Sequence, residues 1–303
     1  MKGQPIDIEL IAAPLGWGAQ LHEAEWGIQA LNDYGLFNAL EPLGKMTTWA
    51  HQVNPATAYS AGKKLSYAQR VEEVAFFAQH LSEVVKTSLL DQHCPLVIGG
   101  DHAIAIGTWS GVVNALNAEQ EFGLIWIDAH MDSHTPQTTP SQAIHGMPLA
   151  ALMGYGEPTL INVGSVGAKL NPRHVVLIGV RSFEEGEAAL LAKLNVKIYF
   201  MTEVKQRGFS AIFNDALNIV TNGTKGFGVS IDLDAFDPIQ VPGVGTPAPD
   251  GIQPNEIYPS LTKLRKISQF KALEIAEHNP TQDSDHKTAK VIQKLIESLV
   301  SHD

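Results

Sequence analysis

The chain has 303 residues, of which 44% are hydrophobic and 17% are charged, which provides enough apolar material for a large core. Its formal net charge is -11 at pH 7, so the protein would repel the phosphates of nucleic acid and an anionic membrane surface, and we expect neither as a partner. No apolar stretch approaches the roughly 20 residues that a membrane-spanning helix needs.

Short runs of apolar or β-branched residues recur along the chain and predict strands. The runs are continuous rather than alternating, which is typical of strands that are buried on both faces of a sheet. In chain order they cover residues 6–12, 95–98, 122–127, 174–179, 196–201, 226–231 and 271–275.

Helical patterns lie between these runs. The clearest covers residues 67–90, and Ser66 with Gln69 predicts a capping box at its start. Similar patterns cover residues 103–117, 184–194, 210–220, 255–267 and 288–300. The alternation predicts an α/β fold with three α/β/α layers and a central, mainly parallel sheet of about eight strands. No repeat, charge block or Ser/Gly linker marks a second domain, so we predict a single domain over residues 1–303.

Polar and charged side chains gather where the predicted strands end. In a parallel α/β sheet, ligands bind beyond the carboxyl ends of the strands. Two long polar stretches, residues 131–145 and 237–254, follow such ends, and loops of that length in a compact domain more often carry function than not. The strand-end sequences are Gly99-Gly100-Asp101-His102, Asp128-Ala129-His130-Met131-Asp132, Asp232-Leu233-Asp234 and Glu277-His278-Asn279-Pro280.

These strand-end sequences predict a metal centre. Side chains at alternate positions of an extended chain point the same way, so the ligands within 128–132 are predicted to converge on one point, as is the pair within 232–234. We expect three adjacent strand ends to bring six ligands together. They are His102, Asp128, His130, Asp132, Asp232 and Asp234.

The composition of this ligand set indicates the kind of metal. Four carboxylates would repel one another without compensation, which divalent cations provide. Oxygen ligands with a minority of imidazole and no thiolate favour Mn2+ or a similar ion over structural zinc. Six ligands exceed what one ion with an open position uses, so we expect two ions that share bridging carboxylates. Asp-x-Asp alone is more often a helix cap or a turn, and Gly-Gly-Asp-His alone is an equally weak signal. The sequence of residues 128–132 is about equally well explained by a metal role, because three possible ligands stand at alternate positions after an apolar strand. The combination of the three motifs favours a metal centre.

The motifs in combination resemble those of the ureohydrolase family, which includes arginases, agmatinases and formiminoglutamases, and they most closely resemble the arginases. The resemblance covers about residues 96–280, and the family's parallel-sheet α/β/α fold agrees with the alternation above. Besides the strand ends after residues 98 and 127, the matching motifs are His145-Gly146-Met147-Pro148, Ser230-Ile231-Asp232-Leu233-Asp234-Ala235-Phe236-Asp237-Pro238 and Gly245-Thr246-Pro247.

The resemblance implies a dimanganese centre, in which Co2+ or Fe2+ could also serve. Asp128 and Asp232 would bridge the two ions. The bridging hydroxide of such a centre would attack the guanidinium carbon of L-arginine and release L-ornithine and urea. The other ligands would complete one ion each, as the pairs His102 with Asp132 and His130 with Asp234.

The resemblance also implies three catalytic residues, His145, Asp132 and Glu277. Glu277 would orient the guanidinium by a bidentate ion pair, and the alternative is an acid at a helix N-terminus or in a surface ion pair. His145 would carry a proton to the leaving amine, since its ordinary pKa is about 6.5, and the alternative is a loop histidine bonded to backbone.

Loop residues set the choice of substrate within the family. The length of the stretch from Asp132 to His145 resembles the arginase version, whereas the agmatinase version is shorter. For Glu185, an acid favoured by a helix N-terminus is as good an interpretation as a ligand role. The substrate-binding residues that the resemblance implies are His134, Thr139, Ser141, Glu184, Glu187, Thr246 and Glu277.

Three positions depart from the arginase pattern. His134 and Ala143 stand where arginases carry Asn residues that touch the substrate carboxylate, and Glu184 stands where Asp is usual. A protonated His134 could itself pair with that carboxylate. We therefore expect remodelled binding of the amino-acid end of L-arginine.

Other functions remain open at this point. A related ureohydrolase could act on agmatine, another guanidino acid or formiminoglutamate, and a substrate without the α-carboxylate would distinguish them. A metal-binding regulatory homologue without turnover would be expected to lack a ligand, His145 or Glu277, and all are present. A nucleotide-binding protein is disfavoured because neither G-x-G-x-x-G nor a Walker A sequence follows a predicted strand.

Compartment and assembly complete the expectations. The single cysteine, Cys94, cannot form an internal disulfide, and residues 1–9 lack the apolar run of a signal peptide. We therefore expect a reducing, cytoplasmic setting. The resemblance implies a homo-oligomer, either a trimer or a hexamer.

Overall fold

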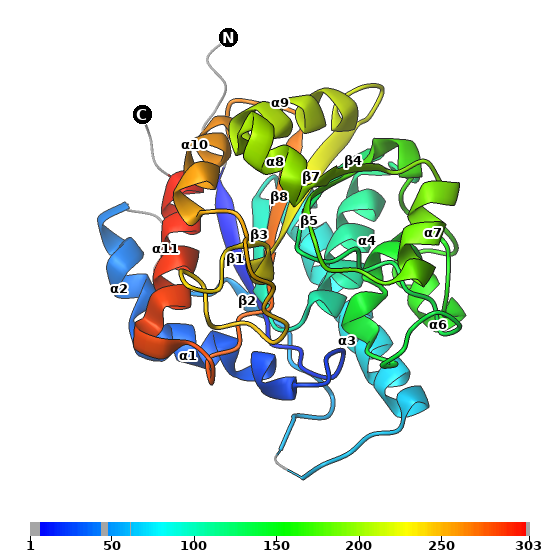
Figure 1. The fold of residues 1–303 in the computed structure, drawn as a ribbon. Coiled ribbons are helices and arrows are strands. Elements are labelled where there is room, and N and C mark those ends of the chain that lie inside the picture. The colour runs from blue at the N-terminus through cyan, green and yellow to red at the C-terminus, as the bar shows by residue number, and fades with distance from the viewer. Residues whose placement is uncertain (1–6, 44–47, 61, 301–303) are drawn as a thin grey trace.

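The computed structural model describes residues 7–43, 48–60 and 62–300, so the expected start of the first strand at residue 6 lies outside the described part. One sheet contains eight strands in the order β2-β1-β3-β8-β7-β4-β5-β6, and every neighbouring pair is parallel (Figure 1). The strands are β1 (Ile8–Ala13), β2 (His51–Gln52), β3 (Cys94–Gly99), β4 (Phe122–Ile127), β5 (Val175–Val180), β6 (Lys197–Phe200), β7 (Gly226–Asp232) and β8 (Phe270–Ala276). The predicted α/β fold with a parallel sheet of about eight strands is confirmed.

Helices cover both faces of this sheet (Figure 1). One face packs against α1 (Gly27–Tyr34), α2 (Leu36–Leu40), α8 (Met201–Arg207), α9 (Phe209–Val220), α10 (Pro254–Leu264) and α11 (Lys287–Val300). The other face packs against α3 (Tyr67–Leu90), α4 (Ala105–Leu116), α5 (Pro148–Leu152), α6 (Pro158–Ile161) and α7 (Glu185–Lys193).

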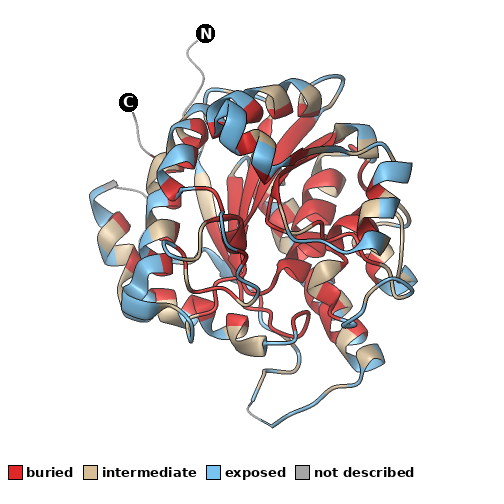
Figure 2. Ribbon diagram, viewed as in Figure 1, coloured by how far each residue is buried: buried red, intermediate tan, exposed pale blue. Residues whose placement is uncertain are grey.

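Alternation along each strand divides the core into two layers. In β4, Ile125 and Ile127 pack into the α9–α11 layer, whereas Leu124 and Trp126 pack into the α3–α4 layer. Figure 2 shows the strands buried in the centre, while the outward faces of the helices are exposed. The continuous apolar runs therefore reflect burial on both faces, as predicted.

Most predicted elements appear with ends that differ by one or two residues. The helix α3 covers the predicted range, and Ser66 accepts a hydrogen bond from the backbone of Gln69 in the predicted capping box. Sequence reasoning missed β2 and the shorter helices, because a two-residue strand or a helix of a few residues shows no periodicity. No helix in the described ranges is long and apolar enough to cross a membrane.

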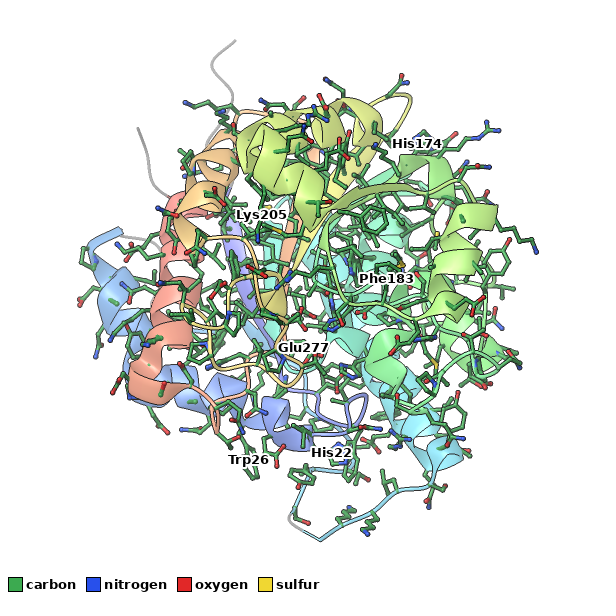
Figure 3. All side chains as sticks on the ribbon, viewed as in Figure 1. His22, Trp26, His174, Phe183, Lys205 and Glu277 are labelled. Atoms are coloured by element: carbon green, nitrogen blue, oxygen red, sulfur yellow. The ribbon has the colours of Figure 1, made fainter. Side chains whose placement is uncertain are left out.

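The sheet order corrects one expectation about the site. The strands that carry the candidate metal ligands, β3, β4 and β7, are not three direct neighbours, because β8 lies between β3 and β7. The insertion of β8 brings its own end, where Glu277 follows the strand, into the middle of the site. Figure 3 shows Glu277 in the centre of the molecule, below the strands.

Candidate metal centre and active site

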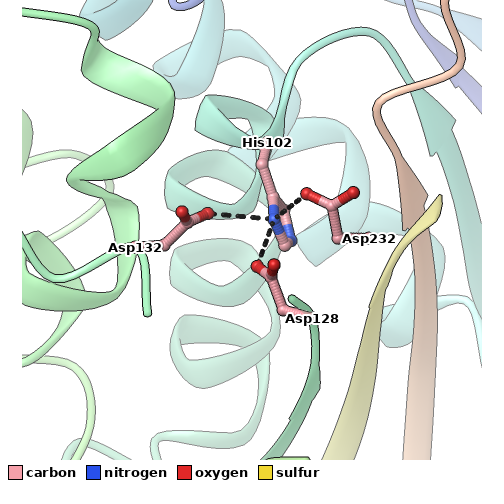
Figure 4. A group of neighbouring side chains, drawn as sticks. All are labelled: His102, Asp128, Asp132 and Asp232. Atoms are coloured by element: carbon pink, nitrogen blue, oxygen red, sulfur yellow. Dashed lines mark ion pairs between the residues drawn. The ribbon is translucent and has the colours of Figure 1, made fainter. Parts of the chain in front are cut away.

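A buried histidine at the end of β3 faces three carboxylates. His102 opens the short helix η3 (His102–Ile104), and its Nδ1 lies 3.4 Å from Oδ2 of Asp128. The same nitrogen lies 3.1 Å from Oδ2 of Asp132 and 3.1 Å from Oδ2 of Asp232. Figure 4 shows the three carboxylates arranged around the imidazole ring. All four side chains are buried, so solvent cannot screen their charges.

A second group adjoins the first and shares one aspartate with it. His130 Nδ1 lies 3.5 Å from Oδ1 of Asp128 and 3.1 Å from Oδ2 of Asp234. Asp128 thus directs Oδ2 to the first group and Oδ1 to the second. The carboxylate of Asp128 lies between two sets of ligands, each of which could hold one cation.

This arrangement corrects the expectation that ligands at alternate positions converge on one point. The chain leaves the sheet after β4, and Asp132 has a φ of 46°, so the extended geometry behind that expectation does not continue. Asp232 and Asp234 also separate, because the helix η6 (Leu233–Ala235) begins between them. Asp232 accepts a hydrogen bond from the Asp234 backbone at 2.8 Å, so it caps that helix as well as facing His102.

Hydrogen bonds behind His102 determine which ring nitrogen faces the carboxylates. The Ser230 hydroxyl donates to Oε1 of Glu274 at 2.7 Å, so its oxygen accepts from Nε2 of His102 at 2.8 Å. Nε2 therefore carries a proton, and Nδ1 is the nitrogen that can offer a lone pair to a metal. Both Ser230 and Glu274 are fully buried.

The electrostatics of the first group fit a cation. Burial and the negative charge of Asp128 raise the pKa of Asp132 to about 6, and burial with the Asp234 and Asp128 charges raises the pKa of Asp232 well above its ordinary value. Burial would lower the pKa of His102, but the surrounding carboxylates outweigh it and raise that pKa well above its ordinary value. Two buried atoms, His102 Nδ1 and Asp132 Oδ2, have no hydrogen-bond partner. A divalent cation would compensate the crowded charge and use both atoms.

His145 and Glu277 form a pair beside the first group. His145 Nδ1 lies 2.8 Å from Oε1 of Glu277, and the same oxygen accepts a hydrogen bond from the His102 backbone at 2.8 Å. Burial would lower the pKa of His145, but the Glu277 charge outweighs it and raises that pKa to about 9. Burial would raise the pKa of Glu277, whereas the His145 charge and these hydrogen bonds hold it below its ordinary value.

Glu277 keeps this position through an uncommon backbone conformation. Its φ is 71°, which costs free energy for a residue with a side chain. Its backbone N–H donates to the Gly100 carbonyl at 2.7 Å, beyond the last ladder pairs of β3 and β8. The left-handed turn directs the carboxylate across the end of β3.

The candidate substrate residues near α7 already have protein partners. His134 Nε2 lies 3.0 Å from Oε2 of Glu184, and its Nδ1 lies 3.2 Å from the Thr138 hydroxyl. Glu184 and Glu187 form a reciprocal capping box at the start of α7, so both acids also act as helix-terminal residues. His134 thus ties the loop that follows Asp132 to the N-terminus of α7.

The hydroxyl residues on the candidate list lie in two places. Thr139 and Ser141 stabilise their own exposed loop, because Thr139 Oγ1 accepts from the Gln142 backbone at 3.0 Å and Ser141 Oγ accepts from the Ala143 backbone at 3.1 Å. Thr246 lies at the metal groups instead, where its hydroxyl donates to Oδ2 of Asp234 at 2.9 Å.

Sequence reasoning missed several residues that support the site. Trp126 donates from Nε1 to Oδ2 of Asp128 at 2.8 Å and stacks on the His102 ring, with ring centroids 4.1 Å apart. Asp101, which precedes the candidate ligand His102, is fully buried. The guanidinium of Arg181 donates to the backbone carbonyls of Gly179, Asp234, Ala235, Phe236, Ala248 and Pro249. Glu274, which holds Ser230 behind His102, was also missed. Its position was the one signal in the sequence, because a charged residue within a run of buried strand residues indicates a buried polar contact.

Comparisons with known proteins agree on one family. The sequence model of the arginase family matches residues 7–301. The arginase of Bacillus caldovelox is 35% identical over 96% of this chain and 97% of the relative, and its solved structure superposes with a TM-score of 0.89 over 98% of this chain and 99% of the other. The arginase of Entamoeba histolytica, solved in complex with L-ornithine, is 27% identical with a TM-score of 0.85, covering 99% of this chain and 100% of the other.

Metal removal is expected to destabilise the protein, because it leaves the buried carboxylates uncompensated. Loading with Mn2+ at a hundred times its dissociation constant should stabilise the fold by about 2.7 kcal/mol per site. Asp128→Asn should reduce binding at both sites, because Asp128 contacts both groups. Metal analysis and thermal unfolding of the chelated and reloaded protein measure both effects. Asp283→Asn, which changes a buried carboxylate at another site, is the control.

The His145–Glu277 pair is expected to make stability depend on pH in the metal-free protein. The pKa of His145 is raised from 6.5 to about 9 on folding, so the contribution of the pair is complete below about pH 6.5 and is lost as the pH rises through about 9. Denaturant unfolding of wild type and His145→Asn at about pH 6 and about pH 10 tests this. The difference between the two proteins should shrink at the higher pH, and a constant difference would contradict the pairing.

Proposed function

The chain belongs to the arginase family of metal-dependent hydrolases, and we propose that it hydrolyses L-arginine to L-ornithine and urea. The observation that carries this proposal is the placement of the His145–Glu277 pair directly beside two adjoining histidine–carboxylate groups. The His145–Glu277 pair could hold a guanidinium and supply a proton, and the two ligand groups could hold one cation each. The named arginases among its relatives support the same reaction.

The ligands of the proposed centre are the six residues named from the sequence. Carboxylate oxygens with two imidazoles and no thiolate favour Mn2+, with Co2+ or Fe2+ as other candidates. When bound, two such ions would lower the pKa of a water so that hydroxide is available near neutral pH. The protein supplies the ligands His102, Asp128, His130, Asp132, Asp232 and Asp234.

Glu277 would hold the guanidinium group, and His145 would protonate the amine that leaves it. Both hydrogen bonds from His145 and from the His102 backbone reach Oε1 of Glu277, so Oε2 would accept from the substrate guanidinium. His145 uses Nδ1 for Glu277, so Nε2 would give its proton to the departing amine as the carbon–nitrogen bond breaks. The His145 side chain is 17% exposed, which would let it recover a proton from solvent.

The amino-acid end of the substrate would be read by the two loops that meet at α7. Glu184 and Glu187 would accept from the α-ammonium, while Thr139 and Ser141 would donate to the α-carboxylate. His134 already contacts Glu184, so in this chain the imidazole would compete with the substrate for that acid. Thr246 would contribute to substrate binding beside Asp234, to which its hydroxyl donates.

We also propose a cytoplasmic setting and a homo-oligomeric assembly. Cys94 is a free, buried cysteine, which suits a reducing cytoplasm. The assembling unit would be one domain over residues 1–303. The resemblance to the family supports a trimer or a hexamer.

The substrate is tested by urea release from L-arginine and from agmatine, measured side by side with Mn2+-loaded protein. We expect a strong preference for L-arginine, because agmatine lacks the carboxylate that the loop hydroxyls would bind. Asp128→Asn serves as the blank. Equal rates would favour a substrate without the α-carboxylate, and no urea from either would redirect the search to other guanidino or formimino compounds.

The role of His134 is tested by His134→Asn. Asparagine cannot form an ion pair with Glu184, so the acid becomes available to the substrate α-ammonium, and we expect the KM for L-arginine to fall by about tenfold, the value of one hydrogen bond to a charged group. The KM for a guanidino compound without either α-group should stay unchanged. A higher KM for L-arginine would mean that His134 itself binds the substrate carboxylate.

A further inference from the structure

Asp101 is a buried carboxylate that has no role in the proposed reaction. It lies between β3 and His102 and is fully inaccessible to solvent. Its Oδ2 accepts hydrogen bonds from the backbones of Gly18 at 2.7 Å and Ala19 at 3.1 Å, and its Oδ1 accepts from Ala103 at 3.0 Å. The Asp101 carboxyl group therefore joins the loop after β1 to the start of η3.

That loop in turn carries the backbone of His145. The Gly18 carbonyl accepts hydrogen bonds from the backbones of Ile144 at 2.7 Å and His145 at 3.1 Å. Gly18 also packs closely against the start of η3, because an added Cβ would lie 2.3 Å from Oδ1 of Asp101 and 2.8 Å from Cβ of Ala103. Its N–H and its carbonyl thus connect Asp101 on one side with His145 on the other.

The remaining contacts close a ring. His145 Nδ1 bonds to Oε1 of Glu277, and this oxygen accepts from the backbone of His102, which follows Asp101 in the chain. We call this closed set the Asp101 ring, and its members are Gly18, Asp101, His102, His145 and Glu277. It links four segments that are far apart in the sequence, and the proposed proton donor His145 is one of its members.

We propose that Asp101 is a positioning residue, which holds His145 in register with Glu277 through the backbone of Gly18. This role rests on the proposed function of His145 as a proton donor. His145 does not belong to a strand, so no sheet hydrogen bonds hold its backbone. Its N–H donates instead to the Gly18 carbonyl. Without Asp101, the Gly18 loop loses two hydrogen bonds to a buried carboxyl oxygen, so the Gly18 carbonyl that accepts from the His145 backbone is no longer held in place.

The kinetic effect should appear in the step that uses the proton. A displacement of about 1 Å in a catalytic group can lower the rate by about 100-fold, so Asp101→Asn should lower kcat by about 10- to 100-fold and change KM by less than about threefold. Gly18→Ala should act in the same direction from the opposite side of the contact, without any change of charge. Glu73→Gln, which alters another buried carboxylate that accepts a backbone hydrogen bond, is the matched control.

A double-mutant cycle separates positioning from a general loss of structure. If Asp101 acts through His145, then Asp101→Asn should cause no further loss of kcat in a His145→Asn background. Metal content and thermal unfolding confirm that each variant is folded and loaded. An equal loss in both backgrounds, or kcat values within about twofold of wild type for both Asp101→Asn and Gly18→Ala, would overturn the proposal.

Hydrogen exchange tests the ring without any assay of activity. Peptides that contain residues 144–145 should lose amide protection in Asp101→Asn and in Gly18→Ala, and should keep it in Glu73→Gln. Unchanged protection in both ring variants would overturn the positioning role. If wild type hydrolyses no guanidino substrate, the proposed function fails, and the exchange result still decides whether Asp101 holds His145.

Discussion

The burial of several carboxylates at one end of a parallel sheet is the constraint around which this structure is organised. Asp128, Asp132 and Asp232 face a single imidazole nitrogen in a region without solvent. Such a concentration of negative charge is unfavourable unless cations compensate it. The orientation of His102 by Ser230 makes Nδ1 a ligand atom, so the protein is prepared for a cation rather than only for an internal ion pair.

The remaining parts of the site are arranged by how the chain leaves each strand. Asp132 and Glu277 both have positive φ values, and these turns direct their carboxylates toward groups that belong to other strands. Strained backbone of this kind persists only where surrounding contacts hold it. For Glu277 those contacts include its N–H bond to Gly100 and the Asp101 ring, which also fixes His145.

The end of the site that would select the substrate is built differently. Its residues lie in loops and at the N-terminus of α7, and they are partly occupied with capping and turn contacts. His134 joins Thr138 to Glu184, so a change at this one position would alter both loops. The two histidine–carboxylate groups are mostly buried, whereas the candidate specificity residues combine buried side chains, His134 and Glu187, with the exposed Glu184.

The sequence alone determined the fold class and the chemical character of the site, because burial on both faces leaves continuous apolar strands and because parallel strand ends collect ligands at one edge. The six candidate ligands and Glu277 follow the ends of predicted strands, whereas His145 came only from the resemblance to the family, and the roles of all eight stay predictions. The tertiary structure decided how these residues divide into two groups, since the turns at Asp132 and η6 break the alternation. It alone placed β8 between β3 and β7, and joined Asp101 to His145 through Gly18. Contacts between segments that are far apart in the chain leave no local pattern, which is the physical reason that sequence reasoning could not reach them.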